Sequence, residues 1–151
     1  MSTAKNILLV EDNPSDVDLT RRALEKARIL NELVVASDGA EALEYLETGA
    51  SQTGWDMPAI VLLDLKLPKI SGIEVLRRIR QNQGLRRLPV VILTSSKDEQ
   101  DLAAVYDFGV NSYIRKPVDF NQFAHCIEQL GLYWLLLNEP PPRREPRDGK
   151  E

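Results

Sequence analysis

The sequence has almost none of the residues that bind soft metals or pair as nucleophile and base. It contains one cysteine, Cys126, and one histidine, His125. A single cysteine cannot form an intrachain disulfide or a cysteine-based zinc site, and a single histidine excludes most zinc enzymes. A serine–histidine–aspartate triad would have to use His125 itself. Any chemistry must therefore come mainly from carboxylates, hydroxyls and lysine.

Long apolar runs and charge of one sign are also missing. The apolar run at residues 7–10 is too short for a signal peptide, and residues 130–137 fall well below the roughly 20 apolar residues of a membrane span. The 19 basic and 23 acidic residues give a net charge of −4 and form no basic stripe. This mixture argues against general nucleic-acid binding. We therefore expect a cytoplasmic protein that binds neither nucleic acid nor membrane.

Length and composition favour one folded domain followed by a tail. A chain of 151 residues, 43% of them hydrophobic, is long enough to bury a core. Residues 139–151 differ from the rest, because they hold four of the nine prolines, four basic and four acidic residues, and none of the residues that build a core. We expect residues 1–137 to form the domain and residues 138–151 to form a mobile tail.

Short apolar runs alternate with segments of helical periodicity along the chain. The expected strands are residues 5–10, 33–36, 60–63, 90–93 and 113–114. The expected helices are residues 14–27, 40–47 with Gly49 as a stop signal, 72–81, 98–108 and 120 to about 137. Asn13 and Asp119 are the expected caps of the first and last helices. Residues 49–58 are expected to form a loop whose Trp55 packs on the sheet edge, with contact to a partner as the alternative. The alternation predicts an α/β fold, a doubly wound parallel sheet with helices on both faces.

Charged and hydroxyl side chains follow the expected strands at their carboxyl ends, where such folds bind ligands. Glu11 and Asp12 follow the first strand and Asp64 follows the third. Three neighbouring carboxylates repel one another, and oxygen ligands without histidine or cysteine indicate Mg²⁺ as the cation between them. After the fourth and fifth strands, Thr94 can donate a hydrogen bond to an oxyanion and Lys116 can reach a phosphate. The set is suited to hold a phosphoryl group beside Mg²⁺.

The segments that carry these residues resemble the receiver domain of two-component response regulators. The matching motifs are ILLVEDN at 7–13, LLDLKLP at 62–68, SG at 71–72, VILTSS at 91–96 and FGVNSYIRKP at 108–117. The resemblance covers residues 5 to about 130. It implies a CheY-like, flavodoxin-like (βα)5 fold whose parallel sheet has the strand order 2-1-3-4-5.

The resemblance implies a phosphoacceptor and a set of metal ligands. Asp64 corresponds to the aspartate that accepts a phosphoryl group from a sensor histidine kinase in a Mg²⁺-dependent reaction. Asp12, Asp64 and the backbone carbonyl of Lys66 would ligate Mg²⁺ directly, and Glu11 would do so mostly through water. Such a protein signals by its own phosphorylation and dephosphorylation, so we expect a signalling protein and not an enzyme.

The resemblance also implies a conformational switch. Thr94 corresponds to the hydroxyl that moves toward the phosphoryl group, and Tyr113 to the aromatic ring that turns inward with it. Lys116 corresponds to the lysine that pairs with the phosphoryl oxygens. Phosphorylation adds about −1.5 to −2 charge in an enclosed site, and this change would shift the balance between two conformations.

The last expected helix carries more apolar surface than one domain needs. Its main stripe holds apolar residues at spacings of three or four, and residues 132–136 make the final turns apolar nearly all round. We expect residues 130–137 to form a homodimer surface with the expected fourth helix and fifth strand; the alternative, that they fold back on their own domain, stays open. The segment LGLYWLLLNEPPP at 130–142 resembles the C-terminal end of stand-alone response regulators that partner bacterial phytochromes, notably in cyanobacteria. This likeness implies a phytochrome-type histidine kinase as partner.

Other functional classes have weaker support in the sequence. An aspartate-nucleophile phosphatase of the haloacid dehalogenase type carries the pattern DxDxT, whereas Lys66 stands here in place of the second acid. A pseudo-receiver that acts only as an interaction scaffold usually loses an acidic or lysine position, and this chain retains them all. A flavin-binding protein would need a glycine-rich loop after the first strand. About 14 residues follow Leu137, too few for a DNA-binding module, so we expect output through protein contact or phosphate relay.

Overall fold

Five parallel strands form the centre of the computed structural model, which describes residues 6–94, 106–110, 112–115 and 120–130. Their order across the sheet is β2-β1-β3-β4-β5, which confirms the predicted flavodoxin-like topology. The strand bounds are Ile7–Val10 for β1, Leu33–Ala36 for β2, Ile60–Leu63 for β3, Val90–Thr94 for β4 and Ser112–Arg115 for β5. The expected strands therefore exist; β2 and β3 have the predicted bounds, and the ends of the other three differ by at most two residues.

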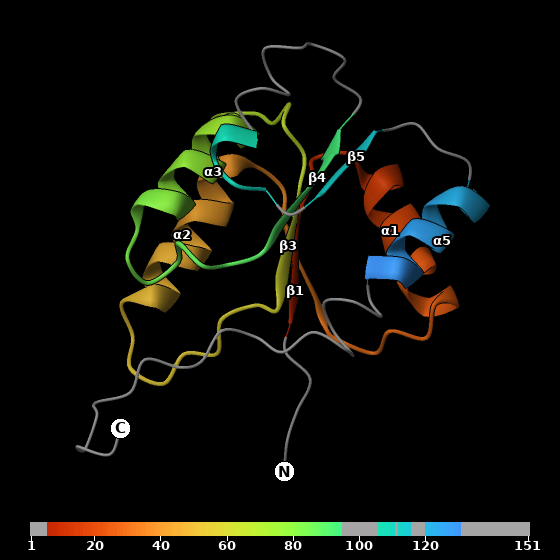
Figure 1. Cartoon of the computed structure of the whole chain (residues 1–151), viewed down its shortest axis with the longest axis horizontal. Helices are drawn as coiled ribbons and strands as arrows, with labels where there is room; N and C mark the ends of the chain where they lie inside the picture. The colour runs from red at the N-terminus through yellow and green to blue at the C-terminus, as the bar shows by residue number, and fades with distance from the viewer. Residues whose placement is uncertain (1–5, 95–105, 111, 116–119, 131–151) are drawn as a thin grey trace.

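Helices cover both faces of this sheet (Figure 1). On one face lie α1 (Pro14–Lys26) and α5 (Phe120–Leu130), and on the other lie α2 (Gly39–Ala50) and α3 (Gly72–Gln81). Because both faces are covered, every residue of β1 and β3 is buried, which explains their unbroken runs of isoleucine, leucine and valine. Alternate residues along these strands pack into two separate apolar clusters, one under each helical layer.

Three helices begin at residues whose side chains accept hydrogen bonds from the first free backbone N–H groups. Asn13 accepts from Ser15 and Asp16 at the start of α1, which confirms the predicted cap. Asp38 accepts from Glu41 at the start of α2, and Ser71 caps α3. The other predicted cap, Asp119, lies outside the described residues. Each cap fixes where the chain turns from a strand end into a helix, at the edge of the sheet where polar residues gather.

The prediction for the second helix was wrong at its C-terminal end. The helix continues through Gly49 to Ala50, so Gly49 is not a stop signal and the loop is shorter than residues 49–58. A β-carbon at Gly49 would overlap the indole ring of Trp55, so this glycine makes room for a side chain. Trp55 also packs edge-on against Tyr45 with ring centroids 6.0 Å apart. Trp55 therefore packs on α2 and against the apolar cluster that includes residues of the sheet. Its predicted contact with the sheet edge stays a prediction.

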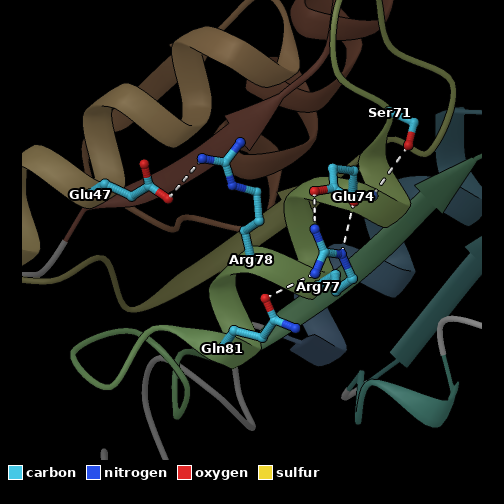
Figure 2. A network of polar contacts seen from close by, with 6 residues as sticks. All are labelled: Glu47, Ser71, Glu74, Arg77, Arg78 and Gln81. Atoms are coloured by element: carbon cyan, nitrogen blue, oxygen red, sulfur yellow. Dashed lines mark hydrogen bonds and ion pairs between the residues drawn. The ribbon is translucent and has the colours of Figure 1, made fainter.

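Polar side chains line the solvent side of α3 and reach α2 (Figure 2). Arg78 forms an ion pair with Glu47 of α2 at 3.7 Å. Arg77 pairs with Glu74 and donates a further hydrogen bond to Gln81, all within α3. The apolar side of α3, which holds Val75, Leu76 and Ile79, is fully buried. The amphipathic pattern predicted for residues 72–81 is confirmed with the same bounds.

Some expected features fall on residues that the structure does not describe. These are most of the expected helix 98–108, residues 131–137 of the expected last helix, and the tail 138–151. The domain boundary at 137 therefore stays a prediction. Within the described part of the chain, every helix is too short or too polar to cross a bilayer.

Candidate functional site

Two neighbouring strands bring two acidic residues to the same edge of the sheet. Val10, the last residue of β1, pairs with Leu63, the last residue of β3. Glu11 and Asp64 therefore leave the sheet side by side. The backbone N–H of Asp64 donates to the carbonyl of Val10 at 3.1 Å, and that of Glu11 donates to Ala36 of β2 at 3.0 Å. These bonds extend the sheet pairing by one residue and fix the backbone positions from which the Glu11 and Asp64 side chains project.

The structure brings together the three carboxylates that follow β1 and β3. One oxygen from each of Glu11, Asp12 and Asp64 lies within 4.8 Å of the others. Glu11 is 3% exposed and Asp64 is 7% exposed, whereas Asp12 faces solvent. Two buried acids and one exposed acid at this spacing repel one another unless a cation lies between them. An all-oxygen donor set of this kind fits a hard divalent cation such as Mg²⁺.

Backbone groups next to the cluster help to orient its carboxylates. The N–H of Asn13 donates to Glu11 Oε2 at 3.3 Å, and the N–H of Lys66 donates to Asp64 Oδ1 at 3.3 Å. Asn13 is itself fixed as the cap of α1. Lys66 lies in the loop that joins β3 to α3, and the bond to Asp64 keeps the Lys66 backbone beside the acidic cluster.

The other predicted site residues are placed less completely. Leu63 of β3 pairs with Ile92 of β4, so Thr94 ends the strand next to the one that leads into Asp64. Tyr113 lies in β5 opposite Ile92. Thr94 and Tyr113 are thus placed by their backbone and by the pairing of β4 with β5. Lys116 lies outside the described residues.

The sequence does not predict the residue that packs against the backbone of Asp64, which is Gly72. A β-carbon at Gly72 would lie 2.6 Å from the Cα of Leu65 and would overlap the backbone carbonyl oxygen of Asp64. The Gly72 N–H also donates to the carbonyl of Leu65 at 2.8 Å. The first residue of α3 therefore packs directly on the backbone of the candidate site. Gly72 belongs to the SG motif at residues 71–72, but the motif alone does not reveal its packing role.

Comparison with known proteins identifies the family of this chain. The family model "Response regulator receiver domain" matches residues 7–128. The probable methanogenesis regulatory protein FilR2 of Methanothrix harundinacea is 42% identical over 135 residues, which cover 89% of this chain and 86% of that protein. Response regulator Rcp1 of Synechocystis sp. is 38% identical over 131 residues, 87% of this chain and 89% of Rcp1.

Solved structures give the same result. The phosphorylated cyanobacterial phytochrome response regulator RcpA has a TM-score of 0.82 and 37% identity, with 93% of this chain and 100% of RcpA covered. The Mn²⁺-bound form of Rcp1 has a TM-score of 0.79 and 37% identity, covering 91% and 99%. The bacteriophytochrome response regulator AtBRR has a TM-score of 0.71 and 54% identity, covering 91% and 100%.

Proposed function

The chain belongs to the response regulator receiver family, and from this premise we propose that it accepts a phosphoryl group from a sensor histidine kinase on Asp64. The observation that carries the proposal is the convergence of three carboxylates, with Asp64 at the end of the central strand β3. A buried aspartate at the carboxyl end of a parallel strand occupies the usual ligand position of this fold. Family membership makes the chain a signalling protein related to phytochrome response regulators.

The proposed reaction exchanges one bond for another at phosphorus. A carboxylate oxygen of Asp64 forms the new O–P bond while the N–P bond of the kinase phosphohistidine breaks, and the electron pair of that bond stays on the imidazole nitrogen. Bound Mg²⁺ would neutralise charge on the phosphoryl oxygens. Asp12, Asp64 and the Lys66 carbonyl would hold the ion, with Glu11 acting mostly through water.

The remaining site residues would convert phosphorylation into a change of conformation. We assign Lys116 to pairing with the phosphoryl oxygens, because an ammonium group stabilises the charge that arrives there. We assign the switch to Thr94, at the end of β4, and to Tyr113 in the adjacent β5. A hydroxyl that moves toward the phosphoryl group would leave space for the aromatic ring, so the two residues would change position together.

The kinase partner proposed for this chain is of the phytochrome type. Support comes from RcpA and AtBRR, which are described as phytochrome and bacteriophytochrome response regulators. The identity of 54% to AtBRR extends over 91% of this chain, so the likeness is not confined to the site. A cytoplasmic location remains a prediction made from the sequence.

The second proposed partner is another copy of this chain, in a homodimer. The proposed contact uses the fourth helix, β5 and the last helix, and its support is the apolar pattern of residues 130–137. As the predicted continuation of the last helix, these residues would present an apolar surface that a second copy of the chain would cover. Light scattering at high concentration, with and without a phosphoryl mimic, should give the mass of two chains; a monomer under both conditions would reject the dimer.

Phosphorylation of the purified protein by acetyl phosphate and Mg²⁺ tests the function directly. Intact-mass spectrometry should show one added phosphoryl group on the wild type and none on Asp64→Asn, which lacks the nucleophilic oxygen pair. Asp18→Asn is a matched control, because Asp18 lies on the exposed side of α1 in an ion pair with Arg22. It should be labelled like the wild type.

The possible outcomes separate the proposal from its alternatives. A stable phosphoprotein recovered from Asp64→Asn would show that Asp64 is not the acceptor. A wild-type protein that takes up no phosphoryl group, from acetyl phosphate or from a phosphorylated kinase, would favour an interaction scaffold. Steady turnover of a phosphomonoester would favour a phosphatase.

A further inference from the structure

The loop between β3 and α3 packs against the first residue of α2. This loop begins at Asp64, carries Lys66 and ends at Ser71, the cap of α3. A β-carbon built at Gly39 would overlap the carbonyl oxygen of Ile70 and lie 2.9 Å from its carbonyl carbon. Backbone therefore occupies the space that any side chain at position 39 would need. The contact joins a helix that bears none of the proposed ligands to the loop that bears two of them, Asp64 and the Lys66 carbonyl.

An ion pair reinforces the same contact from the neighbouring residues. Lys69 Nζ lies 3.4 Å from Asp38 Oδ2. Asp38 is fixed in turn, because its side chain accepts a hydrogen bond from the Glu41 N–H at 2.8 Å as the cap of α2. Lys69 has a φ of 69°, a left-handed backbone conformation that is uncommon for a residue with a side chain. The loop thus adopts an unfavourable turn at the residue that makes the ion pair.

The rest of the loop has little freedom to absorb a displacement at Ile70. The Ile70 N–H donates to the Pro68 carbonyl at 2.8 Å, and at the far end Gly72 packs on the backbone of Leu65. At the start of the loop, the Lys66 N–H donates to Asp64 Oδ1. A shift of Ile70 away from α2 is therefore expected to move Lys66, and with it the backbone carbonyl that is proposed to ligate the metal.

We propose that Gly39, Asp38 and Lys69 are positioning residues for the metal site, although none of them touches the metal. The inference rests on the function proposed above, because it takes the Lys66 carbonyl as a ligand. Divalent metal sites of this type depend on ligand geometry, and Mg²⁺ requires near-ideal octahedral distances. Changes to groups that orient metal ligands typically cost about 10–100-fold in affinity. The start of α2 therefore sets metal affinity, and through it the capacity for phosphorylation.

Two glycine variants in the same helix separate positioning from stability. Gly39→Ala introduces an overlap with the β3–α3 loop, and Gly49→Ala introduces one with Trp55 at the opposite end of α2. Both should lower the midpoint of thermal unfolding in metal-free buffer. Titration calorimetry with Mn²⁺ alone should show about tenfold weaker binding for Gly39→Ala and wild-type affinity for Gly49→Ala. Wild-type affinity in Gly39→Ala, or an equal loss in Gly49→Ala, would overturn the inference.

A third variant applies even where Gly39→Ala does not fold. Lys69→Gln leaves a polar, unbranched side chain that is one bond shorter at the left-handed position, and it removes the charge that pairs with Asp38. Removing a positive charge from the loop that carries the proposed ligands should by itself tighten Mn²⁺ binding, whereas loss of the ion pair that positions this loop should weaken Mn²⁺ binding severalfold. Binding as tight as the wild type, or tighter, would overturn the inference. A wild-type protein that binds no Mn²⁺ would overturn the proposed metal site itself. This result can be told apart from failure of the positioning inference, in which the wild type binds Mn²⁺ and the variants bind it equally well.

Discussion

Arg80 shows how much a single side chain contributes to this fold. It lies on α3, is half-buried, and its guanidinium donates to the carbonyls of Phe108 at 2.7 Å, Gly109 at 3.0 Å, Leu88 at 2.7 Å and Arg86 at 3.3 Å. Burial lowers the pKa of this guanidinium from its ordinary value. The carbonyls belong to the segments that lead into β4 and β5, so one arginine joins α3 to both.

Arg80→Gln should therefore destabilise the protein by about 2 kcal/mol or more, because hydrogen bonds to a charged group each contribute about 1.5–3 kcal/mol and several carbonyls lose their donor. Arg77→Gln is the matched control in the same helix, since the partners of Arg77 are exposed side chains on α3 and such pairs contribute little. Urea unfolding measures both variants. Equal losses would contradict the role of Arg80.

The sequence predicted the carboxylate residues of the site but not the residues that support them. Glu11, Asp12 and Asp64 could be placed because parallel strands end at one edge, a rule that needs only the strand ends. Arg80 could not, because its bonds to Phe108 and Gly109 join residues 28 and 29 positions apart. No local pattern encodes the path that brings those carbonyls within reach.

At the scale of whole elements, the strands were predictable and the second helix was only partly so. Four-residue apolar runs specify β1 and β3 because both of their faces are buried. The end of α2 depends on Gly49, and in sequence a glycine there is a common stop signal. In the structure Gly49 instead makes room for Trp55 and lies inside the helix, and the sequence pattern does not reveal this contact. The close approach of Gly39 to Ile70 was unpredictable for the same reason.

The caps of α1 and α2 should respond differently to pH. The Glu41 N–H and, after it, Lys69 hold the pKa of Asp38 below its ordinary value of 3.8. The unfolded chain therefore takes up this proton at higher pH than the folded chain, so the contribution of Asp38 to stability is present above about pH 4 and is lost as pH falls through the lower folded pKa. Asn13, the cap of α1, has no charge to lose.

Asp38→Ala and Asn13→Ala test this difference in metal-free buffer. Asn13→Ala should cost about 1 kcal/mol of unfolding free energy at every pH, as loss of a helix cap usually does. The loss of unfolding free energy in Asp38→Ala should be full at pH 7. It should shrink as the pH falls below the pKa of the aspartate in the unfolded chain. Urea unfolding at a series of pH values measures both. A cost for Asp38→Ala that grows in acid would contradict the assigned direction of the pKa shift.

At the scale of the whole molecule, the acidic cluster links folding to metal binding. The net charge of −4 is small for 151 residues, but three of the acids are gathered within 4.8 Å at the end of the sheet. Their mutual repulsion opposes folding, and a cation that binds only the folded chain removes that penalty. The site should therefore destabilise the protein when it lacks metal and stabilise it when metal is bound.

Asp64→Asn should consequently change stability in opposite directions with and without metal. In EDTA the variant should be more stable than the wild type, because one repelling charge is gone and the asparagine oxygen can still accept from the Lys66 N–H. In Mg²⁺ at a hundred times the dissociation constant, the wild type should gain about 2.7 kcal/mol and the variant much less. Asp18→Asn, an equal change of charge on exposed α1, should gain as much as the wild type. Urea unfolding under both conditions measures all three, and an Asp64→Asn protein that is less stable in EDTA, or that gains fully from Mg²⁺, would refute the link between the cluster and the metal.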